Sequence, residues 1–124
     1  MAYVILTNNN SFDSAPKGIE IQRVEGLFED VLLAARKLVH LGYKLEVSPL
    51  PASHRMLLSP VRTLVLSEGS TPDQQSMMLI EKELDKYRVT MGVREPDMRN
   101  LNDYEFVDKD LALSALEELG IKIH

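Results

Sequence analysis

One stretch in the first half of the chain constrains the fold more than any other part. Residues 27–50 read LFEDVLLAARKLVHLGYKLEVSPL, and their apolar positions recur every three or four residues, as on the buried face of an amphipathic helix. Acidic residues fall in the first turn and basic residues in the last, which suits the helix dipole. The inward positions are Phe28, Val31, Leu32, Ala35, Leu38 and Val39.

The same stretch predicts where this helix ends and which element comes next. Gly42 suits the position just after a helix, because glycine reaches positive φ without steric cost. Leu45 and Val47 then alternate with charged residues, as in a strand, and Pro49 ends that strand by removing a backbone donor. Residues 19–24 also alternate before the helix. The sequence therefore predicts a strand–helix–strand unit with parallel strands.

Further strands and helices are predicted on both sides of this unit. Residues 3–6 are a short apolar run that is typical of a buried strand, and residues 61–66 are the clearest later strand. A helix is predicted after this later strand, with Thr71 as its N-cap and Pro72 at its first position.

The last third of the chain is more polar and its elements are harder to assign. Residues 94–103 read as a polar connector, and residues 104–107 as a short strand or an anchoring turn. Asp108 suits the N-cap of a final helix through Leu119. Gly120 then predicts a glycine-based ending.

Length and composition bound the fold class and exclude several functions. At 124 residues the chain has the size of one domain, and its pattern predicts a single α/β domain with a mainly parallel, Rossmann-like sheet around a βαβ core. The net charge of −5 argues against nucleic acid as a partner. The absence of cysteine excludes a thiol nucleophile, a disulfide and a zinc–thiolate site. With neither a signal segment nor a membrane-spanning apolar run, we expect a cytoplasmic protein.

Polar side chains are expected to meet at the carboxyl edge of the sheet, where open α/β folds bind ligands. Three asparagines come after the first strand, Ser48 after the strand that succeeds the central helix, and Ser67 and Glu68 after the later strand. Nearby positive charge would suit a carboxylate or phosphate ligand. The candidate ligand-binding residues are Asn8, Asn9, Asn10, His40, Ser48, His54, Arg55 and Arg62.

These residue types also have interpretations that need no ligand. The asparagines suit a sharp turn, because they bond nearby backbone and tolerate left-handed geometry. His40 suits the last turn of its helix as a donor to free carbonyls, and the basic loop residues suit a solvated surface. An enzyme with His40 or His54 as general base is a further alternative. The histidine spacing does not suit a metal, and no nucleotide or hydrolase motif is present, so we assign no catalytic residue, metal or cofactor.

Several short segments, taken together and in order, match a known pattern. They are ILTNN at 5–9, VHLGYKL at 39–45 leading to SPL at 48–50, LVLS at 64–67 and SMMLIE at 76–81. In this order they resemble the GrdX family, small proteins associated with the glycine, sarcosine and betaine reductase systems of anaerobic bacteria. The family tends to carry histidine where this chain has Tyr43 and Ser48, so any role of those histidines is not carried over to this chain.

The resemblance implies a setting rather than a reaction, because members of this family have no established activity. Reduction in those systems uses selenocysteine and cysteine subunits, so a chain without cysteine would be an accessory protein. Two functions are then possible. One is an accessory protein that binds a small anionic or zwitterionic ligand at the strand ends. The other is a homodimeric interaction module that binds a reductase subunit, with Leu33 and Leu113 extending an apolar contact surface.

Overall fold

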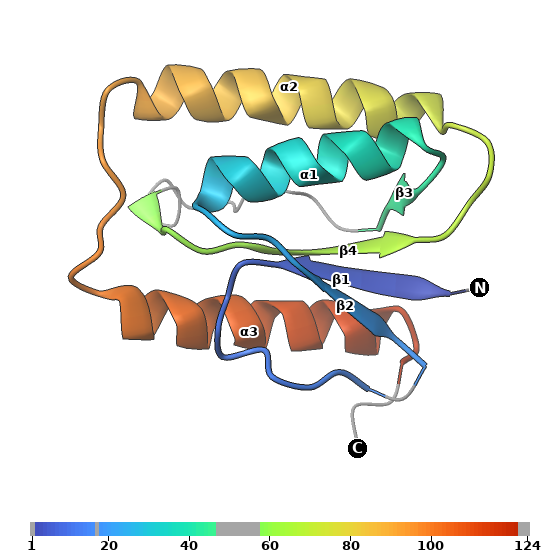
Figure 1. Cartoon of the computed structure of the whole chain (residues 1–124), viewed down its shortest axis with the longest axis horizontal. Helices are drawn as coiled ribbons and strands as arrows, with labels where there is room; N and C mark the ends of the chain where they lie inside the picture. The colour runs from blue at the N-terminus through green and yellow to red at the C-terminus, as the bar shows by residue number, and fades with distance from the viewer. Residues whose placement is uncertain (1, 17, 47–57, 122–124) are drawn as a thin grey trace.

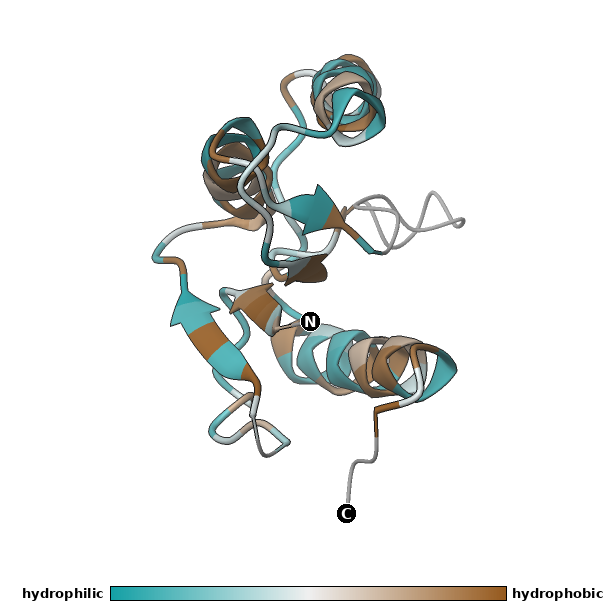
Figure 2. Ribbon diagram, turned by 90° about the vertical axis from the view of Figure 1, so that its right-hand side faces the viewer, coloured by the Kyte–Doolittle hydropathy of each residue, from teal (hydrophilic) through white to brown (hydrophobic). Residues whose placement is uncertain are grey.

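The computed structural model describes residues 2–16, 18–46 and 58–121, which form a sheet covered by helices on both faces (Figure 1). Helices α1 and α2 lie on one side of the sheet and α3 lies on the other (Figures 1 and 2). The elements are β1 (Tyr3–Thr7), β2 (Glu20–Arg23), α1 (Phe28–His40), β3 (Lys44–Leu45), β4 (Thr63–Ser67), α2 (Gln74–Met91) and α3 (Leu101–Glu118).

The sheet has the strand order β2-β1-β4-β3 and is mixed. β1 pairs with β2 in parallel, whereas β4 runs antiparallel to both of its neighbours, β1 and β3. The α/β class is confirmed, but the mainly parallel, Rossmann-like arrangement is not. The apolar runs of β1 and β4 reflect that both faces of the sheet are covered by helices, and that burial is the same whichever way a strand points.

The predicted strand–helix–strand unit is present as β2, α1 and β3. β2 and β3 point in the same direction, because both are related to β1 by the pairings above. They lie at opposite edges of the sheet, however, so α1 crosses over β1 and β4 between them. The helix stripe is confirmed: its buried residues are Phe28, Val31, Leu32, Ala35 and Val39.

Alternation along β1 and β4 divides the apolar core into two clusters. Leu6 pairs with Leu64 and faces the cluster formed with α1 and α2. Ile5 pairs with Val65 and faces the cluster formed with α3. Figure 2 shows the hydrophobic colouring of these central strands between the helix layers. Each central strand therefore contributes to both cores, as a period of two requires.

The glycine stop after α1 is confirmed and also makes a close packing contact. The amide of Gly42 donates to the carbonyl of Val39 and that of Tyr43 to Leu38, both at 3.0 Å, which is the Schellman pattern. Gly42 has a φ of +115°, and a Cβ added to it would lie 2.8 Å from the carbonyl oxygen of Gly69. Gly42 is therefore needed both for its φ and for its lack of a side chain.

Helix α2 begins later than predicted, and Asp73 rather than Thr71 is its N-cap. The Asp73 carboxylate accepts from the Ser76 amide at 3.1 Å and from the Ser76 hydroxyl at 2.6 Å. These hydrogen bonds lower the pKa of Asp73 below its ordinary value of 3.8, and the bond from the Ser76 hydroxyl has the larger effect. A carboxylate at N-cap can satisfy the free amides of the first turn, and Thr71 is too early in the chain to reach them.

Replacing Asp73 by alanine is expected to destabilise the protein at neutral pH and much less in acid. Because the folded protein lowers the pKa of Asp73, its contribution is present above the ordinary pKa and is lost as pH falls through the folded value. Thermal unfolding of the wild-type and Asp73→Ala proteins, from neutral pH down to below the folded pKa of Asp73, measures the loss of stability at each pH. Asp85→Ala, on an exposed face of the same helix, is the control. An equal loss at neutral and acidic pH would contradict the assignment.

Helix α3 begins at Leu101, so residues 104–107 are helical and Asp108 lies inside the helix. The predicted strand or turn at 104–107 and the predicted cap at Asp108 are therefore wrong. The buried positions recur every four residues, and a carboxylate in the middle of this stripe hid the pattern from the sequence. They are Tyr104, Asp108, Ala112 and Leu116. The predicted glycine ending is confirmed, with the Gly120 and Ile121 amides bonded to carbonyls of the last turns.

Candidate functional site

Three of the polar residues predicted to converge, Asn8, Asn9 and Arg62, lie at one end of the sheet, whereas Ser67 does not. Thr7, at the carboxyl end of β1, pairs with Arg23 of β2 and with Thr63 of β4. Because β4 is antiparallel, its first residue rather than its last lies at this edge. Ser67 pairs with Tyr3 and so lies at the opposite edge. We call this end of the sheet, where β1 finishes and β4 begins, the polar edge; the name refers to one end of the strands and not to an outer strand.

The centre of the polar edge is the buried carboxylate of Asp108, which α3 places against the start of β4. Asp108 is 1% exposed. Its Oδ1 accepts from the Thr63 amide at 2.9 Å, and its Oδ2 accepts from the Thr63 hydroxyl at 2.6 Å and from Asn9 Nδ2 at 3.0 Å. Arg62 Nη1 lies 3.9 Å from Oδ1. Donors therefore surround Asp108 on several sides, which suits an acceptor-only group.

A chain of hydrogen bonds extends this arrangement across the strands. The Thr63 hydroxyl donates to Asp108, so in the 2.6 Å contact between the two threonine hydroxyls it is Thr7 that donates to Thr63. The backbone amide of Asn9 in turn donates to the Thr7 hydroxyl at 2.9 Å. Thr7, Asn9, Thr63 and Asp108 form what we call the Asp108 network. All four are buried, and linked bonds in a buried site reinforce one another.

Asn8 and Asn9 use their side-chain amides for contacts within the protein. Asn8 Nδ2 donates to the carbonyls of Pro60 at 2.8 Å and Gly26 at 3.0 Å, and its Oδ1 accepts from the Arg62 amide at 2.9 Å. Asn8 thereby ties β1 to the start of α1 and to the segment before β4.

Asn9 makes a turn bond and a bond to α3. Its Oδ1 accepts from the Ser11 amide at 2.9 Å, as expected of a turn asparagine, and its Nδ2 also donates to the Glu105 carbonyl at 2.9 Å. The left-handed geometry that the sequence suggested is not used, since no described residue other than glycine has positive φ. Asn10 is exposed.

Arg62 lies at the polar edge with most of its side chain buried. Its side chain is 11% exposed. Burial lowers the pKa of its guanidinium from the ordinary value, and the charge of Asp108 opposes this shift. An arginine so placed remains charged, and Asp108 is its nearby counter-charge.

The other candidate residues do not join this edge within the described residues. His40 is exposed at the last position of α1, whereas Asn8 bonds Gly26 before the first, and His40 lines an open hollow of about 450 Å³ with residues of α2, among them Met77 and Glu81. The carbonyls of its last turn are met by the backbone of Leu41, Gly42 and Tyr43. Ser48, His54 and Arg55 lie outside the described residues.

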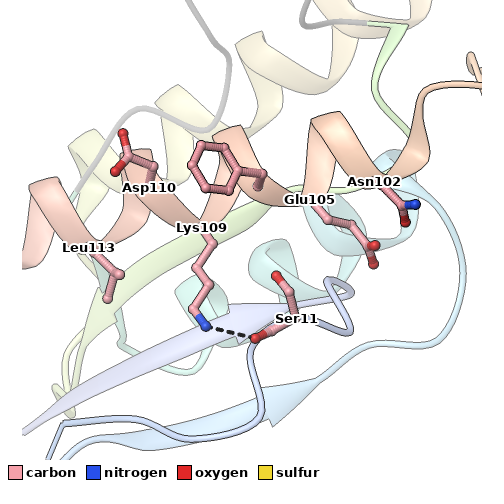
Figure 3. A pocket seen from close by; sticks show the side chains of 7 residues that line it. Ser11, Asn102, Glu105, Lys109, Asp110 and Leu113 are labelled. Atoms are coloured by element: carbon pink, nitrogen blue, oxygen red, sulfur yellow. Dashed lines mark hydrogen bonds between the residues drawn. The ribbon is translucent and has the colours of Figure 1, made fainter.

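A larger hollow lies beside the polar edge, between α3 and the loop after β1 (Figure 3). Its volume is about 520 Å³. Lys109 extends from α3 toward the loop and donates to the Ser11 carbonyl at 2.9 Å (Figure 3). We call this hollow the α3 groove. The residues that line it are Ser11, Asn102, Glu105, Phe106, Lys109, Asp110 and Leu113.

Neither the α3 groove nor the role of Asp108 was predicted from the sequence. Both depend on residues 101–107 being helical, since only then do Glu105, Phe106 and Lys109 line one side of α3. The four-residue spacing from Tyr104 to Leu116 was the available signal.

Other chemical features of the described residues are limited. Within ranges 2–16, 18–46 and 58–121, no three histidine, aspartate or glutamate side chains gather as a metal site. None of the helices in these ranges has the length and apolar composition needed to cross a bilayer. Among the described residues, no hydrogen bond joins His40 to a carboxylate, and the other candidate general base, His54, lies outside them.

Comparison with known proteins identifies a family. Residues 4–117 match the family model described as GrdX-like protein. No curated protein and no solved structure matches the chain. The matched range runs from β1 into the last turn of α3, and so includes both the polar edge and the α3 groove. The chain therefore belongs to the GrdX-like protein family.

Proposed function

We propose that this protein is an accessory protein of a glycine, sarcosine or betaine reductase system that acts by binding another protein. The observation that carries the binding role is the α3 groove, an open hollow of about 520 Å³ beside an exposed Phe106. At the polar edge, by contrast, the side-chain amides of Asn8 and Asn9 already form hydrogen bonds within the protein. The family and the lack of cysteine support the accessory role.

Co-elution with purified reductase subunits tests this proposal. We expect the full chain to shift to an earlier position on size exclusion with at least one subunit of a glycine, sarcosine or betaine reductase. Bovine serum albumin serves as an unrelated control protein. The chain eluting unchanged with each subunit, at concentrations well above a micromolar dissociation constant, would contradict the proposal.

The homodimer alternative loses one of the two residues that suggested it. Leu33 packs partly buried against the α1–α2 core and Leu113 packs partly buried against the α3 core. Leu33 therefore does not extend an exposed apolar surface, whereas Leu113 also lines the α3 groove, which we propose binds a different protein.

A second candidate function is binding of a small carboxylate or phosphate at the polar edge. The observation that favours it is that the mostly buried guanidinium of Arg62 and the side chain of Asn9 both lie against Asp108, while Asn8 accepts from the backbone amide of Arg62. Asn10, Ser48, His54 and Arg55 were predicted for the same ligand, as was His40, which lines a different hollow at the far end of α1. Thermal shift with glycine, sarcosine, betaine and acetyl phosphate tests it, and no stabilisation by any of the four would count against it.

A further inference from the structure

We propose that the α3 groove docks a segment of a partner protein in which a lysine or arginine is flanked by apolar side chains. This inference rests on the proposed function and specifies the surface and the chemistry of the partner. It is carried by the charge, the apolar lining and the internal contacts of the described groove residues.

The charge of the groove is negative, because its lining carries two acids, Glu105 and Asp110, and one base, Lys109. Residues 101–118 read LNDYEFVDKDLALSALEE, with six acidic residues and Lys109 as the one base. Lys109 Nζ donates to the Ser11 carbonyl at 2.9 Å and lies 5.7 Å from the centre of the Phe12 ring. Its charge is thus held against the loop. In the described part of the chain, neither Glu105 nor Asp110 forms an ion pair.

The groove also offers apolar surface that a simple ion would not use. Phe106 is 73% exposed although it is a large aromatic residue. Leu113 lines the same groove and is partly buried against the α3 core, which fixes its position. A lysine or arginine stem can cover such surface while its charged end reaches Glu105 or Asp110. A flanking apolar side chain would bury the ring of Phe106.

Other occupants fit this surface less well. A second copy would bring another acidic α3 and another net charge of −5, so like charges would meet. Nucleic acids and anionic lipid surfaces are repelled for the same reason. A basic apolar protein segment is the occupant that satisfies both the charge and the exposed ring.

A defined peptide series tests the chemistry of the partner. The first probe is a labelled peptide of leucine and lysine at helical spacing, and the second carries glutamate in place of every lysine. We expect fluorescence anisotropy to show binding of the lysine peptide by the full chain, weakening as salt is raised, and no binding of the glutamate peptide. Equal binding of the two peptides, or binding of neither, would overturn the proposal.

Matched variants test the location. Phe106→Ala and Glu105→Gln alter side chains outside the core and keep the helical backbone, and each is expected to weaken the lysine peptide about tenfold. Val89→Ala and Glu95→Gln change the same residue classes at exposed positions outside the groove and should leave binding unchanged. Circular dichroism confirms that all four fold. Equal affinity of the groove and control variants would place the site elsewhere.

The double variant separates this inference from the proposed function. If the wild-type chain co-elutes with a reductase subunit and the Glu105→Gln, Phe106→Ala chain does so equally well, the groove is refuted while the accessory role stands. If no subunit binds the wild-type chain but the lysine peptide still binds the groove, the accessory role is refuted while the surface stands.

Discussion

Asp108→Ala is expected to lower the free energy of unfolding by roughly 3 to 5 kcal/mol, the cost of removing one member of a buried charged arrangement. The substitution leaves the Thr63 amide and hydroxyl without the acceptor they use at 2.9 and 2.6 Å. It also removes the counter-charge 3.9 Å from the Arg62 guanidinium. Urea unfolding followed by circular dichroism measures the change.

Asp108→Asn gives the sharper test because it keeps the size of the side chain. Asp108 accepts hydrogen bonds from the side chain of Asn9 and from the amide and hydroxyl of Thr63. The Arg62 guanidinium, which can only donate, lies beside it. The asparagine NH₂ would replace an acceptor with a donor, so we expect a loss of at least about 2 kcal/mol. Asp110→Asn, at an exposed position two residues away, is expected to change stability by less than about 0.5 kcal/mol. Similar stabilities for the two asparagine variants would contradict the role of the Asp108 network.

Gly42→Ala is expected to destabilise the protein by about 3 kcal/mol, from backbone strain and a steric clash together. The φ of +115° disfavours any residue with a Cβ, and the added atom would lie 2.8 Å from the Gly69 carbonyl oxygen. This clash is with backbone, so a rotamer change cannot relieve it. The contact joins the end of α1 to the segment that leads into α2.

Gly120→Ala isolates the strain from the clash. Gly120 occupies the same position after α3 as Gly42 does after α1, with a φ of +85°, but nothing lies within 4 Å of its added Cβ. We expect a loss of about 1 kcal/mol from backbone strain alone. Thermal and urea unfolding of both variants give the comparison. Equal losses would show that the approach of Gly42 to Gly69 does not contribute.

The proposed binding surface and the Asp108 network use different side chains of the same helix. The buried stripe of α3 carries Asp108, whereas Glu105, Phe106 and Asp110 line the groove. Substitutions in the groove should therefore change binding with little effect on stability, and substitutions of Asp108 should do the reverse.

The local patterns of the sequence were strongest where one face of an element is apolar and its end is marked by glycine. Periodicity gave α1 and its buried face, and Gly42 and Gly120 gave the ends of α1 and α3. The start of α2 was misplaced because Thr71 and Asp73 are both good cap residues, and only the contact with Ser76 distinguishes them.

Only part of the candidate site was predicted, because the rest depends on contacts between distant segments. The convergence of Asn8, Asn9 and Arg62 at one edge was correct, whereas Ser67 lies at the other edge because β4 is antiparallel. Asp108 resembles a cap in the sequence, because an acidic residue inside a helical stripe looks like a helix start. Its partners come from β1 and β4, which are distant in the sequence.

The sequence by itself determined the α/β class, the buried face of α1 and the glycine endings, because these depend on neighbouring residues and on the periods of helices and strands. The tertiary structure decided the direction of β4, the role of Asp108 and the existence of the α3 groove. Those features depend on which donors and apolar surfaces meet across the fold, and residue patterns along one segment do not contain that information.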